Sequence, residues 1–319
     1  MIPRRLTFPW LPRDIPRMQT MNRKHARRRV IALLPVVAAL LGGWAATARA
    51  THATQLKATT VQAFEQYVRS SEARMSQELA GGYRFLWIDA LPEPGRSEAY
   101  ARLRQGQVIT ERLSGHASQE ANSVPGGLIH DWVGIVFIPG TSMPQALALL
   151  QDYEHDAMYY RPEVLQSKLL ERSGDNFRVF LRLRRVRVVT VVFDTEYDVR
   201  YTRRDAAHAW SRSYSTRVAE VDEAGTPREH DRPAGEDRGF LWRLYTYWRF
   251  FEADGGTYVQ CNAISLTRDI PTGLGWLVRP FIEDIPVESL RFTLNATRTA
   301  LVQEHNSQLA PSRHTEVRP

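Results

Sequence analysis

The second half of the chain carries two consecutive hydrophobic patterns. From Asn176 to Asp269 apolar and polar side chains alternate in several runs, which is typical of half-buried β-strands. From Asp284 to about His305 apolar residues recur every three or four positions, which is typical of one face of a helix. This order predicts an α+β fold in which a curved antiparallel sheet wraps around a long C-terminal helix. Such an arrangement can enclose a cavity.

The strand prediction rests on alternation and on turn residues. In one run the side chains on a single face are Phe193, Thr195, Tyr197, Val199 and Tyr201. Gly174-Asp175-Asn176 and Asp254-Gly255-Gly256 predict hairpin turns. The segment Asp222–Arg238 is rich in Asp, Glu, Gly and Pro and predicts a long exposed loop. The other strands expected are Val164–Ser173, Phe177–Arg185, His208–Val221, Phe240–Glu252 and Thr257–Arg268.

Three helices are expected. The closing helix begins at Asp284, with Pro286 in its first turn. Its predicted buried face carries Val287, Leu290, Leu294, Thr297 and Leu301. A capping box of Ser142 and Gln145 starts a second helix. The predicted buried stripe of this second helix is Met143, Leu147, Leu150 and Ala157. A third helix covers Thr59–Leu79 and faces inward with Val61, Phe64, Val68, Met75 and Leu79.

Residues 1–50 have the layout of a leader with a secretory signal peptide. A basic run at Arg23–Arg29 precedes an apolar run at Val30–Trp44, and Ala48-Arg49-Ala50 fits a small-x-small cleavage site. An apolar core of about 15 residues is short for a membrane span, which needs about 20. We therefore expect an exported, periplasmic protein cleaved near Ala50, with an uncleaved membrane anchor as the alternative.

The basic charge of the chain belongs to this leader. Residues 1–50 hold 10 of the 42 Lys and Arg and one of the 35 Asp and Glu, which leaves 32 basic and 34 acidic residues in 51–319, a formal net charge of −2. Nucleic acid is therefore not an expected partner. One concentrated basic run remains, Arg178–Arg187. We interpret it as a solvated strand face, with contact to an anionic membrane surface as the alternative.

Signals for metals, cofactors and catalysis are weak. The single cysteine, Cys261, lies mid-strand and is expected to be a buried small hydrophobe. Asp152-Tyr153-Glu154-His155-Asp156 is dense in ligand types, but no second cluster has matching spacing. A solvated helix end is therefore expected, with a functional acid or base as the alternative. His130-Asp131 is expected to make structural hydrogen bonds. No nucleotide-binding or nucleophile motif occurs. We expect no metal, no cofactor and no identifiable catalytic residue.

The element order resembles a known superfamily. The strand ending Val133-Gly134-Ile135-Val136-Phe137-Ile138-Pro139-Gly140 leads into the capped helix, and Leu266-Thr267-Arg268-Asp269-Ile270-Pro271 precedes the closing helix. Over residues 126–305 this resembles the START/polyketide-cyclase-like (SRPBCC, Bet v 1-like) helix-grip superfamily. The resemblance implies a deep cavity between sheet and long helix for lipids, sterols or polyketides. It supplies no catalytic set to carry over.

The remaining segments flank this domain. Residues 51–125 are expected to elaborate the same sheet, with the third helix, a short strand at Tyr83–Ile88 and another near Gln107–Leu113. About 75 residues with few apolar runs would make a marginal core alone. Residues 306–319 form a polar tail.

Aromatic residues mark the expected pocket. The candidates lining it are Tyr197, Trp210, Arg212, Tyr214, Trp242, Leu244, Trp248, Trp276 and Leu294. Apolar walls with few polar groups are typical of a ligand site. Arg212 shares a strand face with Trp210 and Tyr214. If that face points inward, Arg212 needs an anionic partner from the protein or from a ligand. If it points outward, Arg212 lies in solvent.

The sequence leaves three functions open. The favoured one is a START-like carrier that binds a lipid or another hydrophobic small molecule without catalysis. The alternatives are a cyclase- or hydrolase-type enzyme using the same cavity, and an envelope protein with a solid core.

Overall fold

The structure is a computed structural model that describes residues 56–81, 84–113, 123–186, 189–233, 235–269 and 275–309. Within these ranges the side chains of Ser123 and of residues 275–283 and 307–309 are not described. The chain divides into two compact units, Met1–Thr51 and His52–Pro319, and the described residues belong to the second. The predicted signal peptide and most of the polar tail lie outside the described residues.

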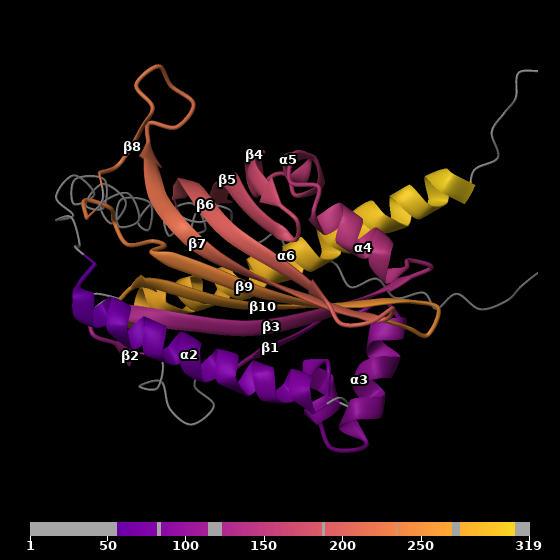
Figure 1. Cartoon of the computed structure of the whole chain (residues 1–319). Coiled ribbons are helices and arrows are strands. Elements are labelled where there is room, and N and C mark those ends of the chain that lie inside the picture. Colours follow the sequence, from indigo (N-terminus) through magenta and orange to yellow (C-terminus); the bar gives the residue numbers. More distant parts are fainter. Residues whose placement is uncertain are drawn as a thin grey trace, which may run out of the picture. The chain divides into compact units, whose positions relative to one another are not determined.

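The described strands form one ten-stranded antiparallel sheet (Figure 1). Eight strands follow the order β1-β3-β10-β9-β7-β6-β5-β4, while β2 pairs with β3 and β8 pairs with β7. The strands are β1 (Ile109–Arg112), β2 (Ser123–Val124), β3 (Gly127–Pro139), β4 (Val164–Ser173), β5 (Asn176–Val186), β6 (Thr190–Arg203), β7 (His208–Asp222), β8 (His230–Asp231), β9 (Arg243–Ala253) and β10 (Gly256–Arg268).

The strands from β4 to β10 form a meander, and its last strand, β10, pairs with the earlier strand β3. Each of β4, β5, β6, β7, β9 and β10 lies beside the next, and β10 then pairs along its whole length with β3, from Gly256 opposite Pro139 to Arg268 opposite Gly127. The chain between β3 and β4 passes through two helices, α4 (Met143–Leu150) and α5 (Asp156–Tyr159). With the closing helix α6 (Gly275–Leu309), this is the expected helix-grip fold.

The hairpin turns lie where the sequence predicts them. Asp254 and Gly255, between β9 and β10, have φ of 55° and 73°. Positive φ at both central residues is typical of a type I′ turn, whose twist matches that of the flanking strands. Gly174, between β4 and β5, has φ of 60°. The expected loop at Asp222–Arg238 contains one short strand, β8.

Helix α6 buries the predicted stripe but starts earlier than expected. Val287, Leu290, Leu294, Thr297 and Leu301 are all at most 8% exposed. The predicted start at Asp284 is wrong, because the helix already begins at Gly275. An aspartate followed by a proline marks a start only when the chain before it is not helical. Inside a helix a proline removes a backbone hydrogen bond, and α6 continues through Pro286 despite that cost.

The other helices give two further corrections. The Ser142 capping box is confirmed at α4, but Ala157 belongs to the separate helix α5. The strand expected at Tyr83–Ile88 is wrong, because the 3₁₀ helix η2 (Trp87–Ala90) forms there. Side chains bind its backbone donors, since Asp89 accepts from Leu86 N at 2.7 Å and Gln260 from Trp87 N at 2.6 Å.

The N-terminal extension packs on the sheet face opposite to α6. Helix α2 (Ala58–Ala80) buries Phe64, Val68 and Met75 against residues of β3 and β10, and α3 (Gly95–Arg104) follows η2 (Figure 1). We call the α6 side of the sheet the inner face and the α2 side the outer face. In the described ranges of the chain, no helix is both long and apolar enough to cross a membrane.

Candidate ligand site between the sheet and the C-terminal helix

Helix α6 is seated on the inner face mainly over β3. A Cβ added at Gly134 would stand 2.6 Å from Leu294 Cδ1 and 3.1 Å from Leu290 Cδ2. The glycine therefore lets the helix approach the strand closely at this point. Leu290 and Leu294 belong to a core cluster that also contains α4 and inner-face residues of β3, β5, β6, β9 and β10.

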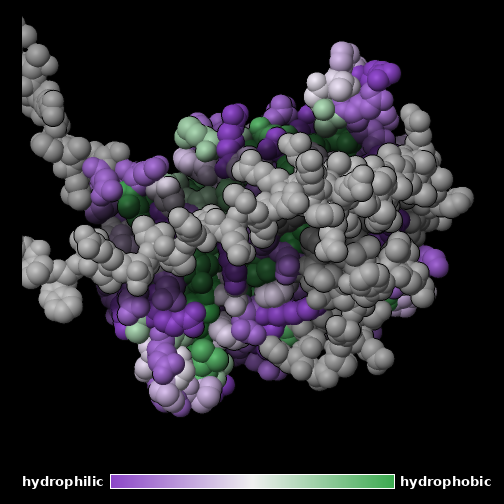
Figure 2. Space-filling view, turned by 180° about the vertical axis from the view of Figure 1, so that it is seen from behind, coloured by the Kyte–Doolittle hydropathy of each residue, from purple (hydrophilic) through white to green (hydrophobic). Residues whose placement is uncertain are grey.

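Over β7 and β9 the inner face carries small polar residues and partly exposed apolar ones. There β7 presents the small polar residues Ser211, Ser213 and Ser215, all buried. On β9, Leu244 and Trp248 pack against the inner core but stay partly exposed. Figure 2, seen from behind Figure 1, shows hydrophobic residues at the surface between hydrophilic ones. Small polar residues lie beside larger, partly exposed apolar ones on this part of the inner face, a composition suited to an apolar ligand.

Buried tyrosines form a polar cluster in the same interior. Tyr201 donates to the carbonyl of Leu150 at 2.8 Å, and its oxygen lies 2.8 Å from the Tyr153 hydroxyl. Tyr160 lies 3.0 Å from the hydroxyl of Thr297, on the buried side of α6. Burial raises the pKa of all three phenols, so they stay neutral.

Asp156 lies among these tyrosines. It is the first residue of α5 and only 6% exposed. Burial, with a smaller contribution from the charge of Asp152, raises the pKa of its carboxyl to about 8. The expectation of a solvated helix end is therefore wrong for Asp156. It holds for Asp152 and His155, which are more exposed and pair at 2.7 Å.

Four of the nine residues predicted from the sequence to line the pocket lie on the inner face. Leu294 is fully buried and Tyr197 is 5% exposed. Leu244 and Trp248 are partly exposed there. Trp276 lies in α6, but its side chain is outside the described residues.

The other four lie toward the outer face. Trp210 packs with the η2 and α3 cluster, and Trp242 and Tyr214 pack with the α2 cluster. Arg212 is exposed and stacks over the Tyr214 ring at 5.5 Å. The inward orientation considered for Arg212 is wrong, because the opposite face of β7, which carries the serines, is the one that points toward α6. The aromatics of β7 and β9 are used to hold α2, since Tyr214 and Tyr247 both donate to Glu72.

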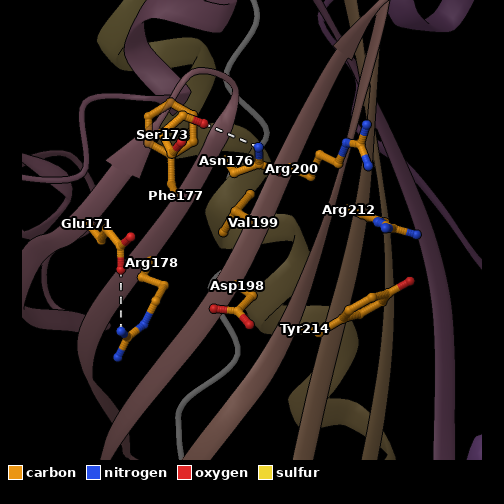
Figure 3. A pocket seen from close by; sticks show the side chains of 10 residues that line it. All are labelled: Glu171, Ser173, Asn176, Phe177, Arg178, Asp198, Val199, Arg200, Arg212 and Tyr214. Carbon is orange, nitrogen blue, oxygen red and sulfur yellow. Dashed lines mark hydrogen bonds and ion pairs between the residues drawn. The ribbon is translucent and has the colours of Figure 1, made fainter.

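A hollow of about 420 Å³ lies beside Arg212 (Figure 3). Its lining is mostly charged or polar, and it includes the ion pair of Arg178 and Glu171 at 3.5 Å. Arg200 and Arg212 lie directly opposite each other across β6 and β7. Such a lining does not suit a hydrophobic ligand, so we place the candidate site on the inner face.

The arginine run is largely neutralised by carboxylates. Arg178 also approaches Glu196 at 3.6 Å. Arg182 is bidentate to Asp194, at 2.7 and 2.8 Å, and contacts Glu229 at 2.7 Å. Arg185 lies 3.0 Å from Glu163. This pairing supports the interpretation of a strand face over that of a membrane-binding patch.

The remaining chemically notable residues have structural partners. His130 lies 3.0 Å from the Thr267 hydroxyl, and burial lowers its pKa to about 4. Asp131 accepts from Tyr67 at 2.8 Å. Cys261 is 3% exposed, and burial raises its pKa. Within the described ranges, no three His, Cys, Asp or Glu side chains are grouped as metal ligands would be.

The sequence did not reveal the burial of Asp156. Tyr153 and Tyr160 lie three residues before it and four residues after it, but Tyr201 and Thr297 come from β6 and α6, so the local spacing alone does not show that the carboxyl is buried. The one available signal was an acidic residue next to tyrosines in a segment dense with charge, and that pattern is more common at solvated helix ends.

Comparisons with known proteins give likeness in fold only. No family model matches this sequence, and no curated protein matches it. A STAR-related lipid transfer protein from Xanthomonas axonopodis is 17% identical, covers 57% of this chain and 97% of its own, and has a TM-score of 0.39. Zhui aromatase/cyclase from Streptomyces sp. R1128 is 13% identical, with coverages of 58% and 98% and a TM-score of 0.36. Human STARD10 is 12% identical, with coverages of 72% and 90% and a TM-score of 0.37.

Proposed function

We propose that this protein binds a hydrophobic small molecule of lipid type between the inner face of the sheet and α6, and carries it without catalysis. The supporting observation is the difference in composition and exposure between two parts of the inner face. Helix α6 is seated tightly over Gly134, whereas β7 presents serines and β9 leaves Leu244 and Trp248 partly exposed. Apolar walls with a few polar groups are the usual composition of a small-molecule site.

A filling substitution tests this proposal. Leu244→Trp adds volume on the inner face, so it should weaken binding of a fluorescent fatty-acid or sterol probe by about tenfold, a loss of about 1.4 kcal/mol. Its thermal midpoint without ligand should stay near the wild-type value. The matched control is Leu170→Trp, because Leu170 is 44% exposed on β4. It should change neither quantity.

Two results would overturn the proposal. In a solid core Leu244→Trp would overpack and cost about 1–3 kcal/mol of stability. That loss, together with no probe binding by the wild type, would leave an envelope protein with a filled core. Mass spectrometry of organic extracts from the purified protein adds an independent measurement, in which a co-purified lipid supports the carrier.

An enzyme of the cyclase or hydrolase type is the second candidate. Asp156 favours it, because a buried carboxyl with a pKa of about 8 can exchange a proton near neutral pH. Turnover of a supplied polyketide or ester that is lost in Asp156→Asn would select the enzyme over the carrier.

We also propose that the protein is exported. The basic, apolar and small-residue segments of residues 23–50 support cleavage after Ala50. N-terminal sequencing of protein from the cell envelope tests this. A chain that keeps Val30–Trp44 would instead indicate a membrane anchor.

A further inference from the structure

Asp156 is a buried carboxyl surrounded by phenols. It lies close enough to Tyr153, Tyr160 and Tyr201 to contribute to the raised pKa of each. These tyrosines come from the α4–α5 connection, the residue after α5, and the inner face of β6. The Tyr160 phenol also reaches Thr297 on α6. The carboxyl therefore lies in the interior between the sheet and α6.

The neighbouring tyrosine protons are already donated elsewhere. Tyr201 donates its single proton to the Leu150 carbonyl, so Tyr153 must donate to Tyr201. Thr297 donates to the Thr293 carbonyl, so Tyr160 must donate to Thr297. None of the three phenols is left with a proton for Asp156.

The carboxyl is thus buried without a donor. In the part of the chain that the structure describes, no hydrogen bond and no basic side chain contacts it, and the nearest charge that acts on it is that of Asp152. A buried carboxylate with no partner is costly. The neutral acid costs less, and in that form the group can both donate and accept a hydrogen bond. Asp156 retains 6% exposure, so the residue is not completely enclosed.

We propose that Asp156 is the recognition group for the polar end of the bound molecule, and that this molecule is a neutral oxygenated lipid such as an ester, a ketone or an alcohol. The proposal rests on the proposed function, because it places the ligand in the same interior. An ester or ketone oxygen accepts the proton of the acid, and an alcohol can also donate to it. A fatty-acid anion would have to leave water for an interior in which no basic side chain contacts Asp156, and a hydrocarbon leaves the carboxyl without a partner.

Competition binding with matched probes tests the proposal. The probes share one long alkyl chain and end in a methyl group, an alcohol, a methyl ester or a carboxylate, and each displaces a fluorescent lipid from the full-length protein. The wild type should bind the alcohol and the ester about tenfold or more tighter than the hydrocarbon or the carboxylate at neutral pH.

Three variants separate recognition from folding. Asp156→Leu removes the hydrogen-bonding group and replaces a buried carboxyl with an apolar side chain, so the variant should fold. It should bind the hydrocarbon at least as well as the wild type does and lose the preference for the oxygen-containing probes. Asp156→Asn keeps one donor and one acceptor and should retain most of the preference. The control is Asp152→Asn, which removes the neighbouring charge at a more exposed position and should leave the preference unchanged.

A pH series gives a second readout. Ionisation of Asp156 near pH 8 removes its proton, so ester binding should weaken above that pH, whereas an alcohol, which can donate, should keep its affinity. The tyrosines on which the charge of Asp156 acts are Tyr153, Tyr159, Tyr160 and Tyr201, and their raised pKa values keep them neutral. Cys261, beside Tyr160, also has a raised pKa. Asp152 is the other charged neighbour, and Asp152→Asn controls for it.

The possible outcomes separate the two proposals. Loss of the oxygen preference in Asp156→Leu with retention in Asp156→Asn supports the recognition role. An unchanged preference in Asp156→Leu, or a wild type that binds the carboxylate tightest, overturns that role and leaves the carrier function standing. Failure of every probe to bind any folded variant overturns the carrier function and the recognition role together.

Discussion

Gly134 of β3 and Leu294 of α6 are in such close contact that no other residue fits at position 134 without movement. The Cβ of an alanine there would stand 2.6 Å from Leu294 Cδ1, well inside van der Waals contact. The absence of a side chain at position 134 therefore lets α6 pack directly against β3. Where α6 lies relative to β7 and β9, and so the space left over the inner face, depends on this contact.

Gly134→Ala should consequently push α6 away from β3. We expect a loss of about 1–3 kcal/mol in the free energy of unfolding, the usual cost of overpacking, measured by urea denaturation. Gly95→Ala is the control, because nothing lies within 4 Å of a Cβ at that position. It should be neutral or stabilising by up to about 1 kcal/mol. Equal effects of the two substitutions would contradict the close contact.

Leu294→Ala should show the full cost of a core truncation. Leu294 is completely buried, so we expect a loss of about 2–5 kcal/mol in the free energy of unfolding. Leu244→Ala should cost less, because Leu244 is partly exposed on the inner face and loses fewer contacts. If the two truncations cost the same, the inner face over β9 is as tightly packed as that over β3.

Arg182→Lys tests whether the arginine run is structural. Lysine keeps the charge but loses the bidentate contact with Asp194, so we expect a loss of about 1–3 kcal/mol in stability. Arg178→Lys should cost less than about 0.5 kcal/mol, because its pairs at 3.5 and 3.6 Å are solvent-exposed. Neither variant should change flotation with anionic vesicles. A loss of flotation would restore the membrane-contact interpretation.

Most of the fold could be predicted because its signals are local. The stripe from Val287 to Leu301 follows helix periodicity, and the hairpin turn at Asp254-Gly255 needs only residues that tolerate positive φ. The start of α6 was missed because a capping pattern at Asp284 says nothing about the chain before it. The strand expected at Tyr83–Ile88 failed for a related reason, since its backbone donors are bound by Asp89 and by the distant Gln260.

The site was harder to predict because alternation along a strand does not say which face is inner. On β7 one parity carries Trp210, Arg212 and Tyr214, and the other carries serines. The aromatic parity resembles a pocket lining, but α2 packs over it and Glu72 binds Tyr214. The choice between the faces is thus made by a helix more than 100 residues away in sequence. Asp156 was missed for the same reason, because its burial depends on β6 and α6.

Asp131 should make the stability of the protein depend on pH. Its carboxyl is fully buried on β3, accepts from Tyr67 and lies 3.8 Å from Arg74. Burial outweighs these two partners and raises its pKa from 3.8 to about 6. The folded state therefore holds the proton more tightly than the unfolded state. The stability that the group contributes is fully present below about pH 4 and is lost as pH rises through about 6.

Comparison with Asp131→Asn isolates this contribution from other titrating groups such as His130 and Asp156. The asparagine stays neutral, and its side-chain oxygen can still accept from Tyr67. Relative to this variant, the wild type should lose on the order of 3 kcal/mol in the free energy of unfolding between about pH 4 and pH 7. Urea denaturation across that range measures the difference. A difference that stays constant with pH, or that grows in the wild type's favour, would show that Tyr67 and Arg74 stabilise the carboxylate more than burial opposes it.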